Sequence, residues 1–299
     1  MSGAIRAASG PPMSGSMRVG RAISALMLAG AALFAPALPA AAERPARVVS
    51  MNLCTDQMAM MLASEGQLLS VSFLAADPRS SAMADAARGY RLNHGRAEEI
   101  FLMRPDLVIA SRFTDSATLD MLRRLGIPVA LFEPATTLPD ISDRLIQMGE
   151  VLGQPGRAAR AAAQYEARLR SLQAEVEQRP RAALYFANGY TLGDKTLAGQ
   201  ILLAAGFENV ATAAGYAHGG TMPLEVLALS APDALLTGNP YPGGSRSEEI
   251  LDHPVVRALR EGRLGASVAD RDWICGTPYV LEAVERLMRL RQAGPEMRQ

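Results

Sequence analysis

The chain has 299 residues, 30 basic and 30 acidic side chains, and a formal net charge of zero. Hydrophobic residues make up 49% of the chain and charged residues 20%, which is typical of a globular protein rather than a disordered one. Proteins that bind nucleic acid usually carry a basic excess, so this charge balance argues against that class.

Residues 1–42 have the pattern of a secretory signal peptide. Arginines precede an apolar run at 22–34, and alanines at 40–42 provide the small residues of a cleavage site. The apolar run is too short, and too interrupted by proline, to span a membrane as a helix. We therefore expect the leader to be cleaved and the mature chain to be exported.

Short apolar runs alternate with helix-forming segments along the mature chain, which predicts an α/β fold with parallel sheets. The predicted strands lie at 47–51, 68–73, 106–110, 128–132, 182–187, 233–237 and 265–269. The predicted helices lie at 56–63, 97–103, 118–125, 138–152, 196–205, 223–229, 254–260 and 278–291.

One long, stiff helix is predicted at 155–178, because apolar residues recur there at spacings of three and four without an internal proline. The alternation of strands and helices restarts after it. We therefore expect two Rossmann-like lobes, residues 43–153 and 180–299, joined by residues 154–179.

Two segments 127 positions apart are similar in sequence, which predicts that the lobes are copies of one unit. Each segment reads as a helix, a Pro-Asp break and a buried strand. The alternative is that Pro-Asp is simply a common turn between a helix and a strand. The paired positions are Glu98 and Glu225, Leu102 and Leu229, and Pro105-Asp106 and Pro232-Asp233.

The sequence lacks the short motifs of several catalytic and metal sites. It has no Gly-x-Ser-x-Gly motif, no complete P-loop and no Gly-x-Gly-x-x-Gly after the first strand. Its three histidines are far apart and include no His-x-x-x-His pair. We therefore expect no catalytic residues, no metal site and no intrinsic cofactor.

Hydrogen-bonding and aromatic side chains follow the predicted strands. Ligands of parallel α/β sheets bind beyond the carboxyl ends of the strands, so these side chains are candidates for binding a polar ligand with an apolar body. Local roles are the alternative, with aromatics covering a core, histidines in plain turns and a solvated arginine. The candidates are Asn52, Cys54, Thr55, Asn93, His94, Arg112, Phe113, Asn188, Tyr190, His218, Tyr241, Asp272, Trp273 and Cys275.

The order and spacing of several motifs resemble those of the periplasmic substrate-binding proteins of iron-siderophore, haem and vitamin B12 ABC importers. Asp272-Trp273 resembles the C-terminal segment of the B12 binders, whereas Leu92 and Ser111 stand where B12 binders have tryptophans. The motifs that carry the resemblance lie at 47–50, 97–100, 104–110, 125–129, 204–209, 224–227 and 232–233.

The resemblance implies two α/β lobes with a ligand cleft between them. It also implies a monomeric periplasmic protein that captures an iron or cobalt chelate, either a corrinoid, a ferric siderophore or haem, and delivers it to an ABC permease in the inner membrane. Glu98 and Glu225 match the acids that dock on permease arginines, although stabilising a helix N-terminus is an alternative role for each. An exported enzyme or a free chelate scavenger is the alternative function.

Both cysteines, Cys54 and Cys275, follow predicted strands and are expected to face the cleft. An oxidising compartment favours a disulfide between them. That bond needs Cα atoms within about 7 Å, however, and a cleft that holds a chelate is usually wider. We therefore expect free thiols, with a disulfide joining the lobes or buried, inert cysteines as the alternatives.

Overall fold

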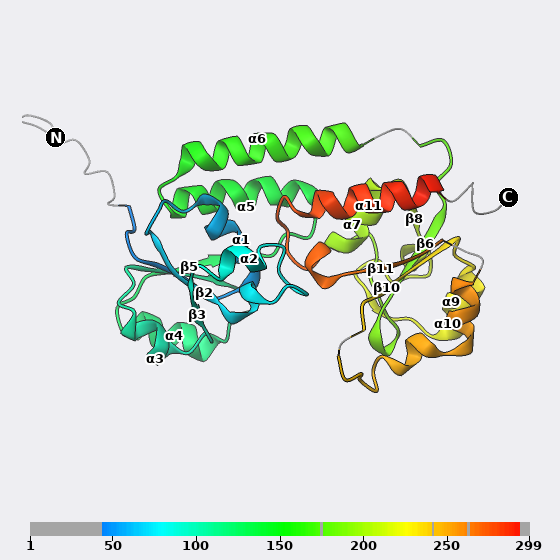
Figure 1. The fold of residues 1–299 in the computed structure, drawn as a ribbon, viewed down its shortest axis with the longest axis horizontal. Helices are drawn as coiled ribbons and strands as arrows, with labels where there is room; N and C mark the ends of the chain where they lie inside the picture. Colours follow the sequence, from blue (N-terminus) through cyan, green and yellow to red (C-terminus); the bar gives the residue numbers. More distant parts are fainter. Residues whose placement is uncertain (1–43, 174–175, 241, 262–263, 294–299) are drawn as a thin grey trace, which may run out of the picture. The chain divides into compact units, whose positions relative to one another are not determined.

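The first lobe is built on a five-stranded parallel sheet in the order β3-β2-β1-β4-β5. Figure 1 shows this lobe at the left, with α3 (Ala97–Leu102) and α4 (Ser116–Arg124) below its sheet. The computed structural model describes residues 44–173, 176–240, 242–261 and 264–293. The strands are β1 (Val48–Ser50), β2 (Leu68–Ser72), β3 (Arg91–Asn93), β4 (Leu107–Ser111) and β5 (Val129–Phe132). The strand order reverses between β1 and β4, so the loops that leave these two strands diverge and open a crevice there.

A second parallel sheet, in the order β11-β10-β6-β8, forms the other lobe. Its strands are β6 (Arg181–Tyr185), β8 (Glu208–Asn209), β10 (Ala234–Gly238) and β11 (Leu264–Val268). Two further strands, β7 (Tyr190–Thr191) and β9 (Gly220–Thr221), form an antiparallel pair. The expected fold class, two Rossmann-like lobes, is therefore confirmed.

Helices pack against both sheets. Several of them begin at a residue whose side chain caps the helix N-terminus. Asn52 caps α1 by accepting hydrogen bonds from the backbone of Cys54 and Thr55, and Thr137 forms a capping box with Asp140 at α5. The first-lobe helices are α1 (Leu53–Leu62), α2 (Ala84–Ala87), α3 (Ala97–Leu102), α4 (Ser116–Arg124) and α5 (Leu138–Val151). The second-lobe helices are α7 (Leu197–Ala204), α8 (Val210–Ala213), α9 (Leu224–Ser230), α10 (Pro254–Arg260) and α11 (Val280–Ala293).

The long helix, α6 (Pro155–Leu172), is shorter than the sequence predicts. Its apolar stripe from Ala158 to Leu172 is buried, as expected, but Gln173 ends the helix. Val176, the next member of the predicted stripe, lies against Gly206 of the second lobe. Helices in proteins are stabilised mainly by packing of their apolar face. The helix therefore ends where the apolar residues of its stripe no longer pack on one continuous surface. Positions 174–175 of the predicted helix lie outside the described residues.

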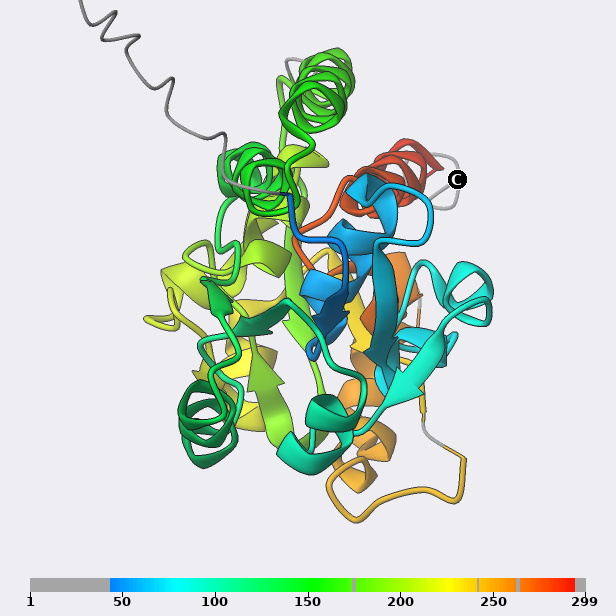
Figure 2. The ribbon, with the colours of Figure 1, turned by 90° about the vertical axis from the view of Figure 1, so that its left-hand side faces the viewer.

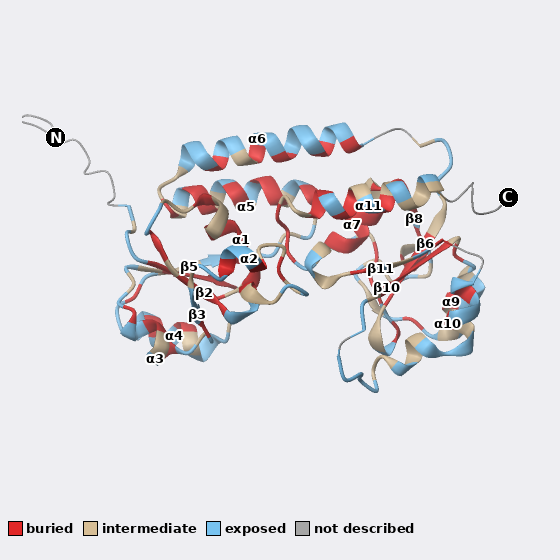
Figure 3. Ribbon diagram, viewed as in Figure 1, coloured by how far each residue is buried: buried red, intermediate tan, exposed pale blue. Residues whose placement is uncertain are grey.

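A continuous apolar core reaches both sheets. It contains Val48 and Ile109 from the first sheet and Leu184 and Leu236 from the second, all nearly inaccessible to solvent. Buried faces of α5, α6 and α11 connect the two ends of this core (Figure 3). These three helices lie on one side of the molecule, away from α3 and α4 (Figure 2).

The 127-residue repeat has the same backbone geometry in both lobes. Arg104, two residues after α3, and Ala231, the C-cap of α9, both have positive φ angles, 49° and 40°. The aspartates that follow then bind the backbone at the start of the neighbouring strand, at Arg47 just before β1 and at Arg181, the first residue of β6. The Asp106 carboxylate accepts from the backbone N–H of Arg47 at 3.0 Å, and the Asp233 carboxylate accepts from that of Arg181 at 2.9 Å. The Pro-Asp turn is therefore part of a duplicated unit.

Candidate functional site

A cavity of about 240 Å³ opens at the β1/β4 crevice and is shared by the two lobes. Four of the residues expected to bind a ligand line it together, although they come from two separate loops: Asn52, Cys54, Thr55 and Phe113. The remaining lining residues are Met58, Ser111, Phe132, Glu133, Pro134, Ala135, Ile274 and Gly276. Of these, Ile274 and Gly276 belong to the second lobe, so the cavity lies where that lobe meets the first.

The polar side of the cavity is formed by the start of α1. The side chain of Asn52 accepts a hydrogen bond from the Cys54 backbone at 3.0 Å, which directs its carbonyl oxygen toward the helix. The Thr55 hydroxyl lies 2.9 Å from the Ser50 hydroxyl and donates to the Asn52 carbonyl at 3.0 Å. The helix cap therefore consumes most of the hydrogen-bonding capacity of this loop.

Its apolar side is formed by Phe132, Ile274 and the strongly exposed ring of Phe113. Beside them, Glu133 lines the cavity and forms an ion pair with Arg112 at 3.0 Å. Both partners are more than half exposed, so the pair contributes little to stability. Sequence reasoning did not identify Glu133 or Ile274, although Glu133 directly follows β5 and obeys the same rule as the other loop residues.

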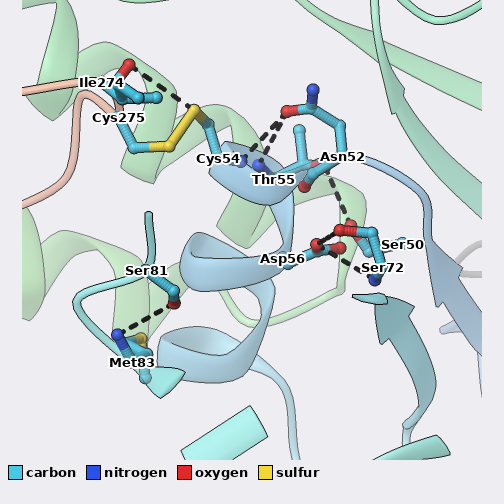
Figure 4. The surroundings of a disulfide bond; sticks show 10 residues. All are labelled: Ser50, Asn52, Cys54, Thr55, Asp56, Ser72, Ser81, Met83, Ile274 and Cys275. Atoms are coloured by element: carbon cyan, nitrogen blue, oxygen red, sulfur yellow. Dashed lines mark hydrogen bonds between the residues drawn. A yellow bond between two sulfur atoms is a disulfide. The ribbon is translucent and has the colours of Figure 1, made fainter. Parts of the chain in front are cut away.

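The expectation of free thiols is wrong, because Cys54 and Cys275 form a disulfide with their Cα atoms 5.0 Å apart (Figure 4). The lobes come this close because the segment before α11 packs directly on the first lobe. The Arg271 backbone N–H donates to the Arg79 carbonyl at 2.9 Å. At Gly276 a Cβ atom would lie only 2.3 Å from that of Ala135, so the backbones meet without an intervening side chain.

Asp272 and Trp273 lie in this bridging segment and are occupied by contacts within the protein. The Asp272 carboxylate pairs with Arg286 and accepts from the Ala269 backbone at 3.0 Å. The Trp273 ring stacks on Phe186 with centroids 5.0 Å apart and packs against the main core. These partners all belong to the second lobe, so both side chains hold the bridging segment against that lobe.

Asn93 and His94 also separate into different roles. Asn93 is fully buried, and its amide donates to the Ser50 carbonyl at 2.8 Å, so it presents no surface to a ligand. His94 is exposed and stacks on Phe73 with ring centroids 5.2 Å apart. The backbone N–H of His94 donates to the Glu99 carboxylate at 2.8 Å. His94 therefore remains available at the carboxyl end of β3.

The second-lobe candidates lie around β7 and β9 rather than in the cavity. Asn188 and Tyr190 follow β6 and are exposed, and Asn188 has a positive φ of 56°. A Cβ atom on Gly219 would lie 3.2 Å from the Tyr190 hydroxyl, so this tyrosine lies beside the exposed loop of His218. Tyr241 lies outside the described residues.

A larger cavity of about 660 Å³ lies within the second lobe at the carboxyl ends of β10 and β11. Arg246 and Arg260 line it together with Glu249 and Asp252, so charges of both signs face the same space. Among the described residues, no group of three His, Cys, Asp or Glu side chains is arranged to hold a metal ion. No described helix has the length and apolar character needed to cross a membrane.

Asp56 is buried directly behind the cavity, on α1. One of its carboxylate oxygens accepts hydrogen bonds from the backbone and the hydroxyl of Ser72, which attaches α1 to the end of β2 (Figure 4). Burial raises the pKa of Asp56 to about 7, because these hydrogen bonds only partly replace the lost hydration. The carboxyl group therefore titrates within the range of ordinary buffers.

A model of the family described as periplasmic binding protein matches residues 48–265, which span both sheets. The chain belongs to this family. The cobalamin-binding protein of Halobacterium salinarum is 27% identical over 204 residues, which cover 66% of this binding protein and 54% of that relative. The matched part thus spans about half the length of the relative. The vitamin B12-binding protein of Vibrio parahaemolyticus is 24% identical over 212 residues, with 69% and 75% coverage.

Solved structures share the fold of this binding protein. The periplasmic heme-binding protein RhuT from Roseiflexus sp. RS-1 has a TM-score of 0.67 at 24% identity and covers 85% of this chain and 99% of its own. The periplasmic heme-binding protein HutB of Vibrio cholerae has a TM-score of 0.67 at 18% identity, with 82% and 98% coverage. The two-lobed architecture is therefore shared well beyond the sequence similarity.

We expect the disulfide to contribute strongly to stability, because it closes a loop of 221 residues in the unfolded chain. Replacing Cys54 and Cys275 by serine should lower the free energy of unfolding by about 3–5 kcal/mol in urea titrations. Thiol titration should detect no thiol in the unreduced, denatured protein and two after reduction. Two reactive thiols before reduction would contradict the bond, and reductant should leave the stability of the double variant unchanged.

We also expect the raised pKa of Asp56 to produce a pH-dependent stability. Between about pH 4 and pH 7 the folded chain retains a proton at Asp56 that the unfolded chain has lost, so the free energy of unfolding should fall as pH rises, by about 4 kcal/mol at most. Asp56→Asn should remove this slope, whereas Asp143→Asn on the exposed face of α5 should retain it. Parallel stability curves for the wild type and Asp56→Asn would contradict the assignment.

Proposed function

We propose that this binding protein is the exported substrate-binding component of an ABC importer, and that it captures a metal chelate and delivers it to a membrane permease. The cavity at the β1/β4 crevice carries the proposal, because its wall combines loops of the first lobe with Ile274 and Gly276 of the second. A ligand bound there contacts both lobes at once. This is the arrangement expected of a protein that binds a ligand and delivers it to a partner.

The chemistry of the lining supports a chelate with broad apolar faces and polar edges. Phe113, Phe132 and Ile274 offer apolar surface, whereas Asn52 and Glu133 offer polar groups at the rim. The cavity is smaller than the roughly 300–1,000 Å³ of typical ligand pockets, so a macrocycle fills it with one side only. The remainder of the ligand then extends across the exposed ring of Phe113. The names of the relatives, which bind cobalamin and heme, agree with this class of ligand.

The same proposal covers the compartment in which the protein acts, its oligomeric state and its lack of catalytic activity. An importer component of this kind acts in the periplasm as a monomer and has no catalytic activity of its own. The predicted signal peptide at 1–42, which is outside the described residues, is consistent with export. Family membership supports the binding role over an exported enzyme.

Native mass spectrometry should show retention of one chelate after incubation with cyanocobalamin, haemin or ferrichrome. Phe113→Ala and Ile274→Ala should each weaken binding of the retained chelate by about tenfold, since each removes an apolar wall of the cavity. Met121→Ala, at an exposed position on α4 outside the cavity, is the matched control and should bind as the wild type does. Retention of none of the three chelates would contradict the proposal.

Glu98 and Glu225 are proposed to dock on cationic residues of the permease, one from each lobe. Both carboxylates are exposed in the first turn of a short helix, α3 or α9, and neither lines the cavity. Changing both residues to arginine should abolish chelate uptake in whole cells and leave the affinity for the chelate unchanged. Glu150→Arg, on an exposed position of α5, should leave both properties intact.

Two outcomes would contradict this docking role. Loss of chelate affinity in the purified double variant would place the acids in the binding site. A large fall in its melting temperature, with uptake lost only in proportion, would show that the carboxylates mainly stabilise the N-termini of their helices.

A further inference from the structure

Two of the most exposed apolar side chains in the described part of the chain occupy equivalent positions in the two lobes. Leu229 is 86% exposed and Leu102 is 74% exposed, and these leucines are 127 residues apart. Each follows the paired glutamate, Glu225 or Glu98, by four positions. Phe113, which has a similar exposure, is already accounted for because it lines the cavity.

The opposite faces of the two helices explain how the leucines come to be exposed. Ile100 of α3 and Leu227 of α9, also 127 residues apart, are fully buried and attach their helices to the lobes. Arg104, two residues after α3, and Ala231, the C-cap of α9, both have positive φ angles. The duplicated backbone therefore directs the same positions inward and outward in each lobe, and both helices show an exposed side in Figure 3.

A single exposed leucine is common on protein surfaces and carries no information by itself. An exposed leucine at the same position of both lobes is informative, because the fold does not require it. Alanine or a polar residue at either position would be compatible with the same fold. Residues four apart on a helix are neighbours, so each lobe presents a carboxylate beside an isobutyl group. Two matching surfaces of this kind suit a partner that itself offers two matching surfaces.

We propose that Leu102 and Leu229 are the apolar anchors by which the two lobes bind a single dimeric membrane protein, each beside its glutamate. This inference rests on the proposed function and names two further residues of the docking surface. Each leucine enters an apolar pocket of one permease subunit next to the cation that its glutamate pairs with. The exposed carboxylates disfavour an anionic lipid surface as the occupant, since like charges repel.

Burial of the leucines gives the interface an affinity that the ion pairs alone do not supply. Exposed ion pairs contribute little in water and are screened by salt, whereas burial of a leucine side chain is worth about a tenfold gain in affinity or more. The charges then set the rate of encounter and the orientation. Docking that persists at high salt is therefore a property that the leucines, rather than the glutamates, confer.

The test measures binding of the purified protein to the ABC permease that supports chelate uptake in the source organism, held in phosphatidylcholine nanodiscs. Leu102→Ser and Leu229→Ser should each weaken binding by about tenfold, and the double variant by more. Leu125→Ser, at an exposed leucine without a counterpart 127 residues away, is the matched control and should bind as the wild type does. Chelate affinity should be unchanged in all three single variants, and the melting temperature should be unchanged in Leu102→Ser and Leu229→Ser, whose side chains are largely exposed.

Each other outcome has a defined meaning. Unchanged permease binding by the leucine double variant, with binding abolished by charge reversal of Glu98 and Glu225, would overturn this inference and leave the proposed function standing. If the wild type bound neither the chelate nor the permease, the proposed function itself would be overturned. Binding of the wild type to empty anionic nanodiscs, or a self-association that Leu102→Ser abolishes, would replace the permease by a lipid surface or a second copy of this chain.

Discussion

The two sheets share one apolar core, and this shared core joins two similar lobes into one protein. It passes from the first sheet to the second along α5, α6 and α11. Each lobe also buries a separate apolar cluster of its own on the other face of its sheet. The Cys54–Cys275 bond and the Arg271 contact join the lobes again at the cavity. Because the lobes are attached at two separate places, we expect only small rotations between them.

The residues around the cavity fall into two groups, those of the bridging segment between the lobes and those of exposed loops. Asp272 and Trp273 of the bridging segment are held by contacts within the second lobe, whereas Arg271 and Cys275 of the same segment contact the first lobe. Phe113, on the loop after β4, remains exposed. Polar and aromatic residues that look alike in the sequence, each in a loop after a strand, are therefore partly buried by internal contacts in one segment and exposed in another.

Much of the architecture is predictable because its signals are local. Apolar runs mark the buried strands, and the Pro-Asp turns mark the repeat. Strand β3 was missed because Arg91 and Leu92 at the edge of the sheet are exposed and form no apolar run. The end of α6 and the disulfide depend on which surfaces meet in three dimensions. No pattern of spacing reveals that Val176 packs on Gly206, or that the cysteine Cα atoms lie 5.0 Å apart.

The stack of Phe186 and Trp273 has a consequence for observing this protein in solution. Trp273 is the only tryptophan of the chain, and it lies two residues from Cys275 in the segment that joins the lobes. The fluorescence of Trp273 therefore reports on the segment that carries Cys275, without a background from other indoles. A nearby disulfide quenches indole emission, so the emission intensity carries information about the covalent state of the junction as well as its packing.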